Sequence, residues 1–228
     1  MSSVSAAAPN SHWPYPRFIA HRGGGTLAPE NTLAGFREAR HFCFQGIETD
    51  VMLTADGAAV LSHDPVLGRV VKSASPVASL SLKEIKTLDA GSLTAQKWAG
   101  ERIPTLEEAI ETCEANGLFM NIEIKPASES AAQATAQETV RIARKLFAGK
   151  SLPLLSSFSR NALAAAAVEA EVGIKAYWRR GKTQGKIRVW SCMDISFTNP
   201  DVLQAGITAG QATKMIVPFS YCAGDFLQ

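Results

Sequence analysis

Short clusters of histidine, carboxylate and basic side chains recur where strand-like apolar runs give way to polar loops. The clusters are His21-Arg22-Gly23, Glu48-Thr49-Asp50, His63-Asp64 and Glu123-Ile124-Lys125. Carboxylate oxygens suit a hard divalent cation, Arg and Lys bind phosphate oxygens, and imidazole exchanges a proton near neutral pH. These residue types together fit metal-assisted cleavage of a phosphodiester.

Strand periodicity predicts that the carboxylates share one face. Residues 46–53 have the pattern of a strand, and because successive strand side chains alternate between faces, Glu48 and Asp50 project to the same side. Residues 119–125 indicate another strand, in which Glu123 and Lys125 share the polar side. Two strands thus offer three carboxylates to one cation.

A tight hairpin is expected to bring the third cluster beside the second. Asp56-Gly57 separates the strand that holds Asp50 from an apolar run at residues 58–62, and Asp-Gly between two such runs is a strong hairpin signal. With the turn centred on these two residues, Asp50 lies opposite His63. The hairpin therefore predicts a histidine next to the carboxylates.

The elements that must position these residues follow a βα pattern. Apolar runs alternate with longer helical patterns, which is typical of parallel strands joined by crossover helices and indicates the α/β class. The predicted strands cover residues 18–20, 46–53, 58–62, 119–125, 152–156, 193–197 and 215–219. The predicted helices cover residues 31–44, opened by a cap at Asn31 or Thr32, and residues 81–88, 107–113, 130–147 and 161–170. The run from Thr105 to Glu108 resembles a helix start for the third of them.

Length and composition favour a single domain. With 228 residues and 46% hydrophobic content, the chain can bury one substantial core and falls in the range of an α/β barrel. Residues 1–16 are expected to form a flexible lead-in, followed by one domain over residues 17–228. Within it, residues 64–100 contain few strand signals and are interpreted as an excursion over the site.

Charge, cysteine spacing and hydropathy argue against several classes of partner. The chain carries 23 Lys and Arg against 21 Asp and Glu, so a nucleic-acid partner is not expected. Its cysteines lie apart without a CxxC pair, which favours reduced thiols in the cytoplasm over disulfides or zinc. No run approaches the ~20 apolar residues of a membrane span, so we expect a soluble protein without stable membrane insertion. The sequence leaves a homo-oligomer open.

Five motifs in a fixed order support one family. The runs IAHRGG, APENT, IETDV, LSHD and NIEIKP occur in that order and spacing, and through them the chain resembles the glycerophosphodiester phosphodiesterase family, in its small cytosolic bacterial form, over about residues 14–170. The resemblance implies a distorted (β/α)8 barrel of the TIM type. It also implies a divalent metal and hydrolysis of a small-molecule glycerophosphodiester to sn-glycerol 3-phosphate and an alcohol.

The resemblance also implies a role for each matching residue. By position these are the acid/base pair His21 and His63, the Mg²⁺ or Ca²⁺ ligands Glu48, Asp50 and Glu123, the phosphate contacts Arg22 and Lys125, and the supporting residues Glu30 and Asn31. One histidine helps water or a neighbouring substrate hydroxyl to attack, and the other protonates the leaving alkoxide. Which histidine does which is left open.

Each residue also has a simpler interpretation. A lone histidine such as His12 or His41 is more often structural than catalytic, and Glu123 with Lys125 can be an ion pair on a strand. The glycines at 23–25 can form a bare turn instead of a phosphate cradle. Carboxylates on two strands together with two histidines nevertheless favour the metal site, because an ordinary strand end has no need of that combination.

The last quarter of the chain departs from the pattern. From residue 171 the resemblance fades into a basic run over residues 175–188 with poor periodicity, interpreted as a solvated surface or a loop. The late strands leave the barrel without a closing strand, so it is expected to be irregular or incomplete at this end. Either an insertion, a deletion or a shifted reading frame altered the tail, or residues 190–228 complete the barrel by another route, with or without a partner subunit.

Two alternatives therefore accompany the enzyme hypothesis. The first is a catalytically impaired remnant or phosphate-ligand-binding module with an altered C-terminal tail. The second is a lipid phosphodiesterase that works at a membrane surface, for which Trp178 and Trp190 among basic residues are the only hints.

Overall fold

Six parallel strands form the framework of the structure. The computed structural model describes residues 15–16, 18–148, 150 and 153–171, and the backbone of two later strands. The strands are β1 (Phe18–Ala20), β2 (Gly46–Leu53), β3 (Ala59–Leu61), β4 (Phe119–Ile124), β5 (Leu154–Ser157), β6 (Arg188–Ser191) and β7 (Met215–Val217). All neighbours in the order β6-β5-β4-β2-β1-β7 are parallel, and β3 pairs antiparallel with β2.

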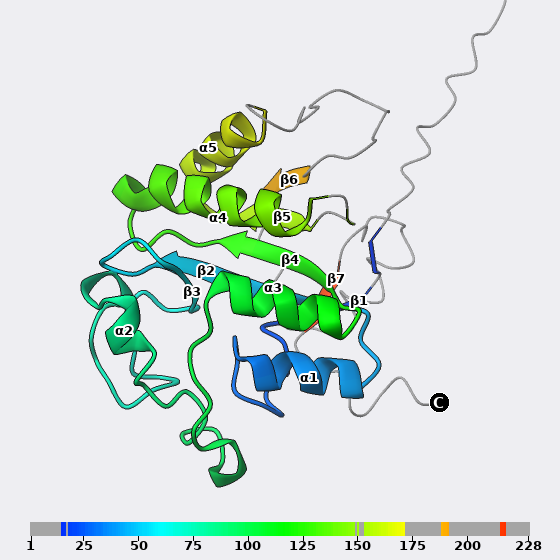
Figure 1. The fold of residues 1–228 in the computed structure, drawn as a ribbon, viewed down its shortest axis with the longest axis vertical. Coiled ribbons are helices and arrows are strands. Elements are labelled where there is room, and N and C mark those ends of the chain that lie inside the picture. Colours follow the sequence, from blue (N-terminus) through cyan, green and yellow to red (C-terminus); the bar gives the residue numbers. More distant parts are fainter. Residues whose placement is uncertain are drawn as a thin grey trace, which may run out of the picture.

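Helices cover one face of this sheet. The described α-helices are α1 (Leu33–His41), α2 (Leu82–Ile85), α3 (Leu106–Ala115), α4 (Ala132–Leu146) and α5 (Arg160–Glu171), and all of them except α2 lie along this face (Figure 1). Short 3₁₀ turns occur at Val77–Ser79, Gln96–Trp98 and Glu129–Ala131. Figure 1 shows α1, α3, α4 and α5 following one another along the sheet, and each of them contacts the next. Parallel strands with helices between them are the predicted α/β arrangement.

The main core lies between the sheet and these helices. Ile47 and Val51 of β2 and Ile122 of β4 are fully buried there, packed with Phe36 of α1 and Ile110 of α3. Full burial of such a side chain contributes roughly 1.5–3 kcal/mol. Since strand side chains alternate, the carboxylates of β2 project to the opposite face. A register shift of one residue would turn them into the apolar core, so the packing strongly disfavours it.

Two helices begin at caps that the sequence predicts. The Thr32 hydroxyl accepts a 3.1 Å hydrogen bond from the Gly35 N–H, so Thr32, and not Asn31, caps α1. Thr105 and Glu108 form a reciprocal capping box at the start of α3. A cap of this kind contributes about 0.5–2 kcal/mol to the stability of a helix. Asn31 lies one residue before the cap of α1, so its side chain is available for another role.

The β2–β3 hairpin is real, but its predicted register is wrong by one residue. Val51 pairs with Leu61, and the Ser62 N–H donates to the Asp50 carbonyl at 3.1 Å. Asp50 therefore lies opposite Ser62, one residue before His63. The cause is a turn of three residues in place of two, closed by Gly57 with a φ of +81°. Such three-residue turns commonly end in a left-handed glycine.

Residues 64–100 carry a smaller core of their own. Leu67, Val71, Val77 and Ile85 are buried against Met52 of β2. Figure 1 shows α2 and the loops around it at the end of the sheet to which the arrows of β2 and β4 point. This segment therefore packs as an ordered unit at the carboxyl ends of the strands, where ligands of α/β barrels bind.

Close packing of the loop after β1 leads to a first prediction. A Cβ on Gly24 would lie 2.6 Å from the Ala28 Cβ and 3.2 Å from the Gly35 Cα, so the loop must move to accept it. We expect Gly24→Ala to lower the free energy of unfolding by about 1–3 kcal/mol, the usual cost of overpacking. Urea denaturation followed by circular dichroism measures this change. An unchanged denaturation midpoint would show that the loop can move away from α1 without a loss in the free energy of unfolding.

Several expectations concern residues outside the described part of the chain. These are the lead-in up to residue 14, His12, most of the basic run at 175–188, the strand at 193–197, Cys192 and Cys222. The strand predicted at 215–219 corresponds to β7, whereas β6 at 188–191 was not predicted. None of the described helices is long and apolar enough to cross a membrane.

Candidate active site

Neighbouring strands β2 and β4 bring three carboxylates together. Asp50 and Glu123 are paired across the two strands, and Glu48 lies two residues before Asp50 on the same face. One carboxylate oxygen from each residue lies within 4.8 Å of the other two. Their exposed fractions are 1% for Glu48, 2% for Asp50 and 6% for Glu123. The predicted cluster of acidic residues is thus confirmed as a buried group.

Burial makes this concentration of negative charge costly. Loss of hydration raises the pKa of Glu48 well above its usual range, and the charges of Asp50 and Glu123 raise it further. A hydrogen bond of 3.1 Å from the Arg22 backbone N–H to Glu48 Oε2 opposes the shift without cancelling it. In the absence of a cation, the cluster therefore holds a proton at a pH where an exposed glutamate has lost it.

Two cationic side chains border the cluster. Arg22 Nε lies 3.8 Å from Asp50 Oδ2, and Lys125 Nζ lies 3.4 Å from Asp50 Oδ1. The Lys125 side chain is a quarter exposed, and the Arg22 guanidinium also reaches Glu30 Oε2 at 3.2 Å. Both groups predicted to contact phosphate therefore lie at the edge of the cluster, where they can meet an anion from solvent.

Asn31 holds the site together more directly than its supporting role suggested. Its Nδ2 donates to Asp50 Oδ2 at 2.9 Å, while its Oδ1 accepts from the Thr49 hydroxyl at 2.7 Å and from the Asp50 N–H at 3.3 Å. Its own N–H donates to the Arg22 carbonyl at 3.0 Å. Asn31 and Arg22 both have left-handed backbones, with φ values of 52° and 54°. Strain of this kind is typical of functional sites.

His21 stands at the end of β1 beside the carboxylates. Its Nε2 lies 3.8 Å from Glu48 Oε2. Burial lowers the pKa of His21 to about 4, and the positive charge of Arg22 contributes in the same direction. The negative charge of Asp50 opposes this shift without cancelling it. His21 is therefore neutral near pH 7.

His63 has a fixed orientation. Its Nδ1 lies 2.7 Å from Asp64 Oδ1. Burial alone would raise the pKa of Asp64, but hydrogen bonds from His63 and Arg69 and the charge of Arg69 outweigh burial and lower it. An ionised carboxylate only accepts hydrogen bonds, so Nδ1 carries the proton that it donates to Asp64. This leaves Nε2 as the nitrogen available to a substrate.

Sequence reasoning missed three residues that contact the predicted site residues. Thr49 donates to Asn31, Asp64 accepts from His63, and Arg69 reaches both Asp64 and Glu30. Asp64 stands in the LSHD motif, so its position next to His63 was a usable signal. Nothing in the sequence around Arg69 marks it.

The donor set fits a hard divalent cation. Two oxygen ligands of one ion can lie no farther apart than twice the metal–oxygen distance, which is about 4.2 Å for Mg²⁺ and about 5 Å for Ca²⁺. The three carboxylate oxygens lie within 4.8 Å of one another, which is inside the limit for Ca²⁺, whereas Mg²⁺ requires the side chains to draw slightly closer together. Asn121, paired with Glu48, and Ser156, paired with Glu123, are also buried, and their side-chain polar atoms have no hydrogen-bond partner among the described residues. The cluster therefore has both the charge and the free oxygens that a cation site needs.

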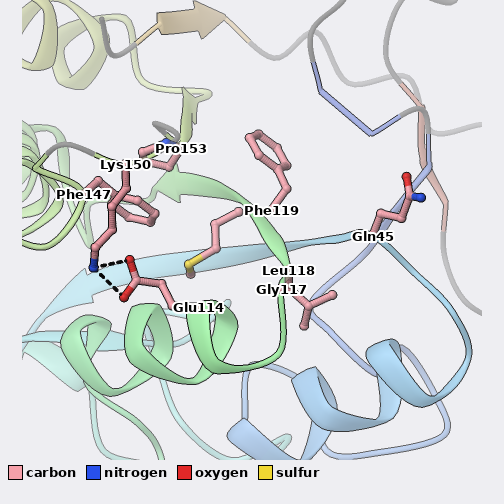
Figure 2. Close-up of a pocket in the computed structure, with 9 residues that line it drawn as sticks. Gln45, Glu114, Gly117, Leu118, Phe119, Phe147, Lys150 and Pro153 are labelled. Atoms are coloured by element: carbon pink, nitrogen blue, oxygen red, sulfur yellow. Dashed lines mark hydrogen bonds and ion pairs between the residues drawn. The ribbon is translucent and has the colours of Figure 1, made fainter. Parts of the chain in front are cut away.

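A cavity at the other end of the strands lacks such chemistry. It has a volume of about 530 Å³ and lies where β4 begins, lined by Gln45, Phe119 and Pro153 among others. Figure 2 shows that Lys150 and Glu114, the charged residues of its lining, pair with each other; Lys150 Nζ lies 2.7 Å from Glu114 Oε1. The two charges neutralise each other. The group that can do chemistry is therefore the carboxylate cluster, not this cavity.

Comparison with known proteins connects this geometry to one family. The family model described as the glycerophosphoryl diester phosphodiesterase family matches residues 21–205. A glycerophosphodiester phosphodiesterase from Caldanaerobacter subterraneus subsp. tengcongensis is 47% identical over 107 residues, which cover 47% of this chain and 44% of that relative. Glycerophosphodiester phosphodiesterase 1 of Homo sapiens is 36% identical over 118 residues, which cover 51% of this chain and 36% of that relative.

Solved structures agree with the sequence match. A phosphodiesterase from Oleispira antarctica, solved in complex with the product sn-glycerol-3-phosphate, superposes with a TM-score of 0.65 and 38% identity, covering 68% of this chain and 62% of that one. A glycerophosphodiester phosphodiesterase from Agrobacterium tumefaciens superposes with a TM-score of 0.61 and 28% identity, covering 69% and 64%. The predicted TIM-type α/β barrel fold is thereby confirmed.

The family match extends beyond the five motifs, and the chain spans only part of its relatives. The family match runs to residue 205, well into the part of the chain that was expected to diverge from residue 171. The chain nevertheless spans less than half the length of the two relatives above, at 44% and 36%.

Proposed function

Because the chain belongs to the glycerophosphoryl diester phosphodiesterase family, we propose that it hydrolyses glycerophosphodiesters, the deacylated forms of phospholipids, to sn-glycerol 3-phosphate and an alcohol. One observation carries the proposal. Three buried carboxylates from β2 and β4 meet beside a histidine and two cationic side chains at the carboxyl ends of the strands. The product bound to the Oleispira antarctica phosphodiesterase supports the choice of substrate class.

Glu48, Asp50 and Glu123 would hold the divalent cation, Mg²⁺ or Ca²⁺. When bound, the cation supplies positive charge that polarises a phosphoryl oxygen. Arg22 and Lys125 bind the remaining phosphate oxygens, the first through its planar guanidinium and the second as a point charge. Both lie within 4 Å of Asp50, so they orient the phosphate against the cluster.

The two histidines divide the proton transfers. A group with a pKa of about 4 carries no proton near pH 7, so His21 cannot be the resting proton donor and is assigned to accept. As the oxygen of water bonds to phosphorus, its proton passes to His21; where a neighbouring substrate hydroxyl attacks instead, a cyclic phosphate forms, and water opens it in a second step to give sn-glycerol 3-phosphate. As the bond from phosphorus to the alcohol oxygen breaks, His63, which must carry a proton on both ring nitrogens for this step, gives that oxygen the proton of Nε2. Such transfers contribute typically 100- to 10,000-fold in rate.

The setting that we propose is the cytoplasm. Cys43 and Cys113 are free thiols, which suits a reducing compartment. A homo-oligomer is compatible with this proposal, and neither a nucleic-acid partner nor stable membrane insertion is part of it.

A phosphate-binding module that lacks turnover is the competing function. The set of candidate side chains that would carry catalysis is complete, and the family match extends through residue 205, so the module is not favoured. The two functions differ in one measurable respect, since a module binds sn-glycerol 3-phosphate but releases none from a diester.

Activity in the presence and absence of cations tests the proposal. We expect the purified chain to release sn-glycerol 3-phosphate from glycerophosphocholine with Mg²⁺ or Ca²⁺, and to lose at least about 100-fold in rate with EDTA, because the carboxylates alone cannot polarise the phosphate. Coupled glycerol-3-phosphate dehydrogenase measures the product. Turnover indifferent to EDTA would remove the cation from the proposal, and binding of product without turnover would establish the module.

A further inference from the structure

Arg69 makes three short contacts to two different carboxylates. Its Nη1 and Nη2 donate to Glu30 at 2.5 and 2.6 Å, and its Nε donates to Asp64 Oδ2 at 2.7 Å. The planar guanidinium uses three nitrogens at once, a geometry that an ammonium cannot reproduce. Arg69 therefore joins two loops that are otherwise separate in the sequence, one after β1 and one after β3.

Each of these carboxylates holds a residue of the proposed site. Asp64 accepts from His63 Nδ1 through its other oxygen, at 2.7 Å. Glu30 accepts from Arg22 Nη1 at 3.2 Å. Burial opposes ionisation of Glu30, but the hydrogen bonds from Arg69 and Arg22 and their charges prevail and lower its pKa. A chain of charge-assisted contacts thus runs from Arg69 to the proposed proton donor and to a proposed phosphate contact.

The backbone around Arg69 is flanked by buried residues, whereas its side chain is half exposed. Leu67 and Val71, two residues to either side, are buried in the smaller core of residues 64–100. The Arg69 side chain itself is 48% exposed. Exposed ion pairs contribute little to stability, so three short contacts at this place are better explained by orientation of their partners.

We propose that Arg69 is a positioning residue that sets the orientation of His63 through Asp64 and of Arg22 through Glu30. The inference rests on the proposed function, because it assigns Arg69 to the same site. It gives the segment at residues 64–100 a role in the chemistry, since this segment supplies the group that aligns Arg22 of the loop after β1 and His63, which directly precedes the segment. This positioning role depends on the planar guanidinium, which donates from three nitrogens at once, and not on its positive charge alone.

Replacing Arg69 by alanine and by lysine separates the effect of its planar geometry from the effect of its charge. We expect Arg69→Ala to lower kcat by about 10- to 100-fold, the usual effect of a residue that orients a site residue. Arg69→Lys keeps the charge but cannot grip both carboxylates, so its kcat should stay within about 3-fold of the alanine variant. The double variant Asp64→Ala/Arg69→Ala should lose less kcat than the product of the two single losses, because both residues act on His63 through one contact, and only the effect of Arg69 on Arg22 through Glu30 is left to add. Arg141→Ala is the control, since Arg141 makes a similar two-pronged pair with Glu138 far away on α4 and should keep full activity.

A spectroscopic measurement reports on His63 without turnover. The chain has four histidines, so their ¹⁵N signals can be assigned one by one with single substitutions. In the neutral ring, His63 should be protonated at Nδ1 because Asp64 accepts that proton. Free imidazole side chains favour Nε2 instead. In Arg69→Ala we expect the His63 signals to move toward the Nε2-protonated form.

The outcomes separate the two claims. Recovery of kcat in Arg69→Lys, or His63 signals unchanged in Arg69→Ala, would overturn the positioning role while the proposed hydrolysis stands. If the unmodified chain released no product, the proposed function would fail, and the role of Arg69 in that reaction would fail with it. The ¹⁵N signals would then still decide whether Arg69 orients His63.

Discussion

Replacement of Glu48 by glutamine is expected to abolish turnover and, at the same time, to stabilise the cation-free protein. The loss of one ligand should lower kcat/KM by at least about 1,000-fold, which corresponds to about 4 kcal/mol of transition-state stabilisation. The gain in stability has a different origin. Glu48 is buried beside two further carboxylates, and glutamine keeps its shape without the charge.

The stability effect should depend on pH with a definite sign. Burial, together with the charges of Asp50 and Glu123, raises the pKa of Glu48 in the folded state above the ordinary value of 4.5. Between that value and the folded pKa, the folded state binds more protons than the unfolded chain. Stability from this group is therefore complete below about pH 4.5 and is lost as the pH rises through the folded pKa.

Thermal unfolding in EDTA measures both effects. The melting temperature of Glu48→Gln should exceed that of the unmodified chain at about pH 8, and the difference should shrink toward about pH 5. Added Ca²⁺ or Mg²⁺ should raise the melting temperature of the unmodified chain only. Glu111→Gln on the exposed side of α3 is the matched control and should change neither property. A variant that melts below the unmodified chain at high pH would refute the idea of a strained cluster.

The histidine variants are expected to lose the next largest amounts of activity. His21→Ala and His63→Ala should each lower kcat by at least about 100-fold with glycerophosphocholine, the scale of general acid/base groups. The two variants should respond differently to the leaving group. A p-nitrophenolate leaving group needs no proton, so a p-nitrophenyl ester of glycerol phosphate should restore most of the activity to His63→Ala but not to His21→Ala.

Steady-state rates with both substrates test this division. His41→Ala is the control, because His41 is exposed in the last turn of α1 and touches the neighbouring Phe42 ring. If the activated ester restores His21→Ala instead, the donor and the acceptor must be exchanged. Near-normal turnover of either variant with glycerophosphocholine would remove that histidine from the mechanism.

Regular patterns explain what could be predicted from the sequence. The alternation of β2 identifies Glu48 and Asp50 as neighbours on one face, and the alternation of β4 places Glu123 on the polar face of its strand. Helix starts were predictable where the cap is a local signal, as at Thr105. These features depend on residues only a few positions apart, or on the period of a strand, and both are visible in one chain.

Features without a local or periodic signal could not be predicted. The hairpin register shifted by one residue because the left-handed Gly57 closes a three-residue turn, whereas an Asp-Gly pair also fits a two-residue turn. Asn31 finds its partners 18 and 19 residues away, and Arg69 reaches a carboxylate 39 residues away. Contacts of this kind are set by the fold, so a single sequence contains no pattern that predicts them.

Strands β2 and β4, which carry the proposed metal ligands, adjoin each other. Strand β1, which leads into His21, lies next to β2. Bond cleavage is thus assigned to one wall of the barrel. Mutations elsewhere around the mouth can change which alcohol is accepted without touching the groups that cleave the ester. Under the proposed function, substrate specificity for the alcohol can therefore change step by step during evolution, while the residues that cleave the ester stay the same.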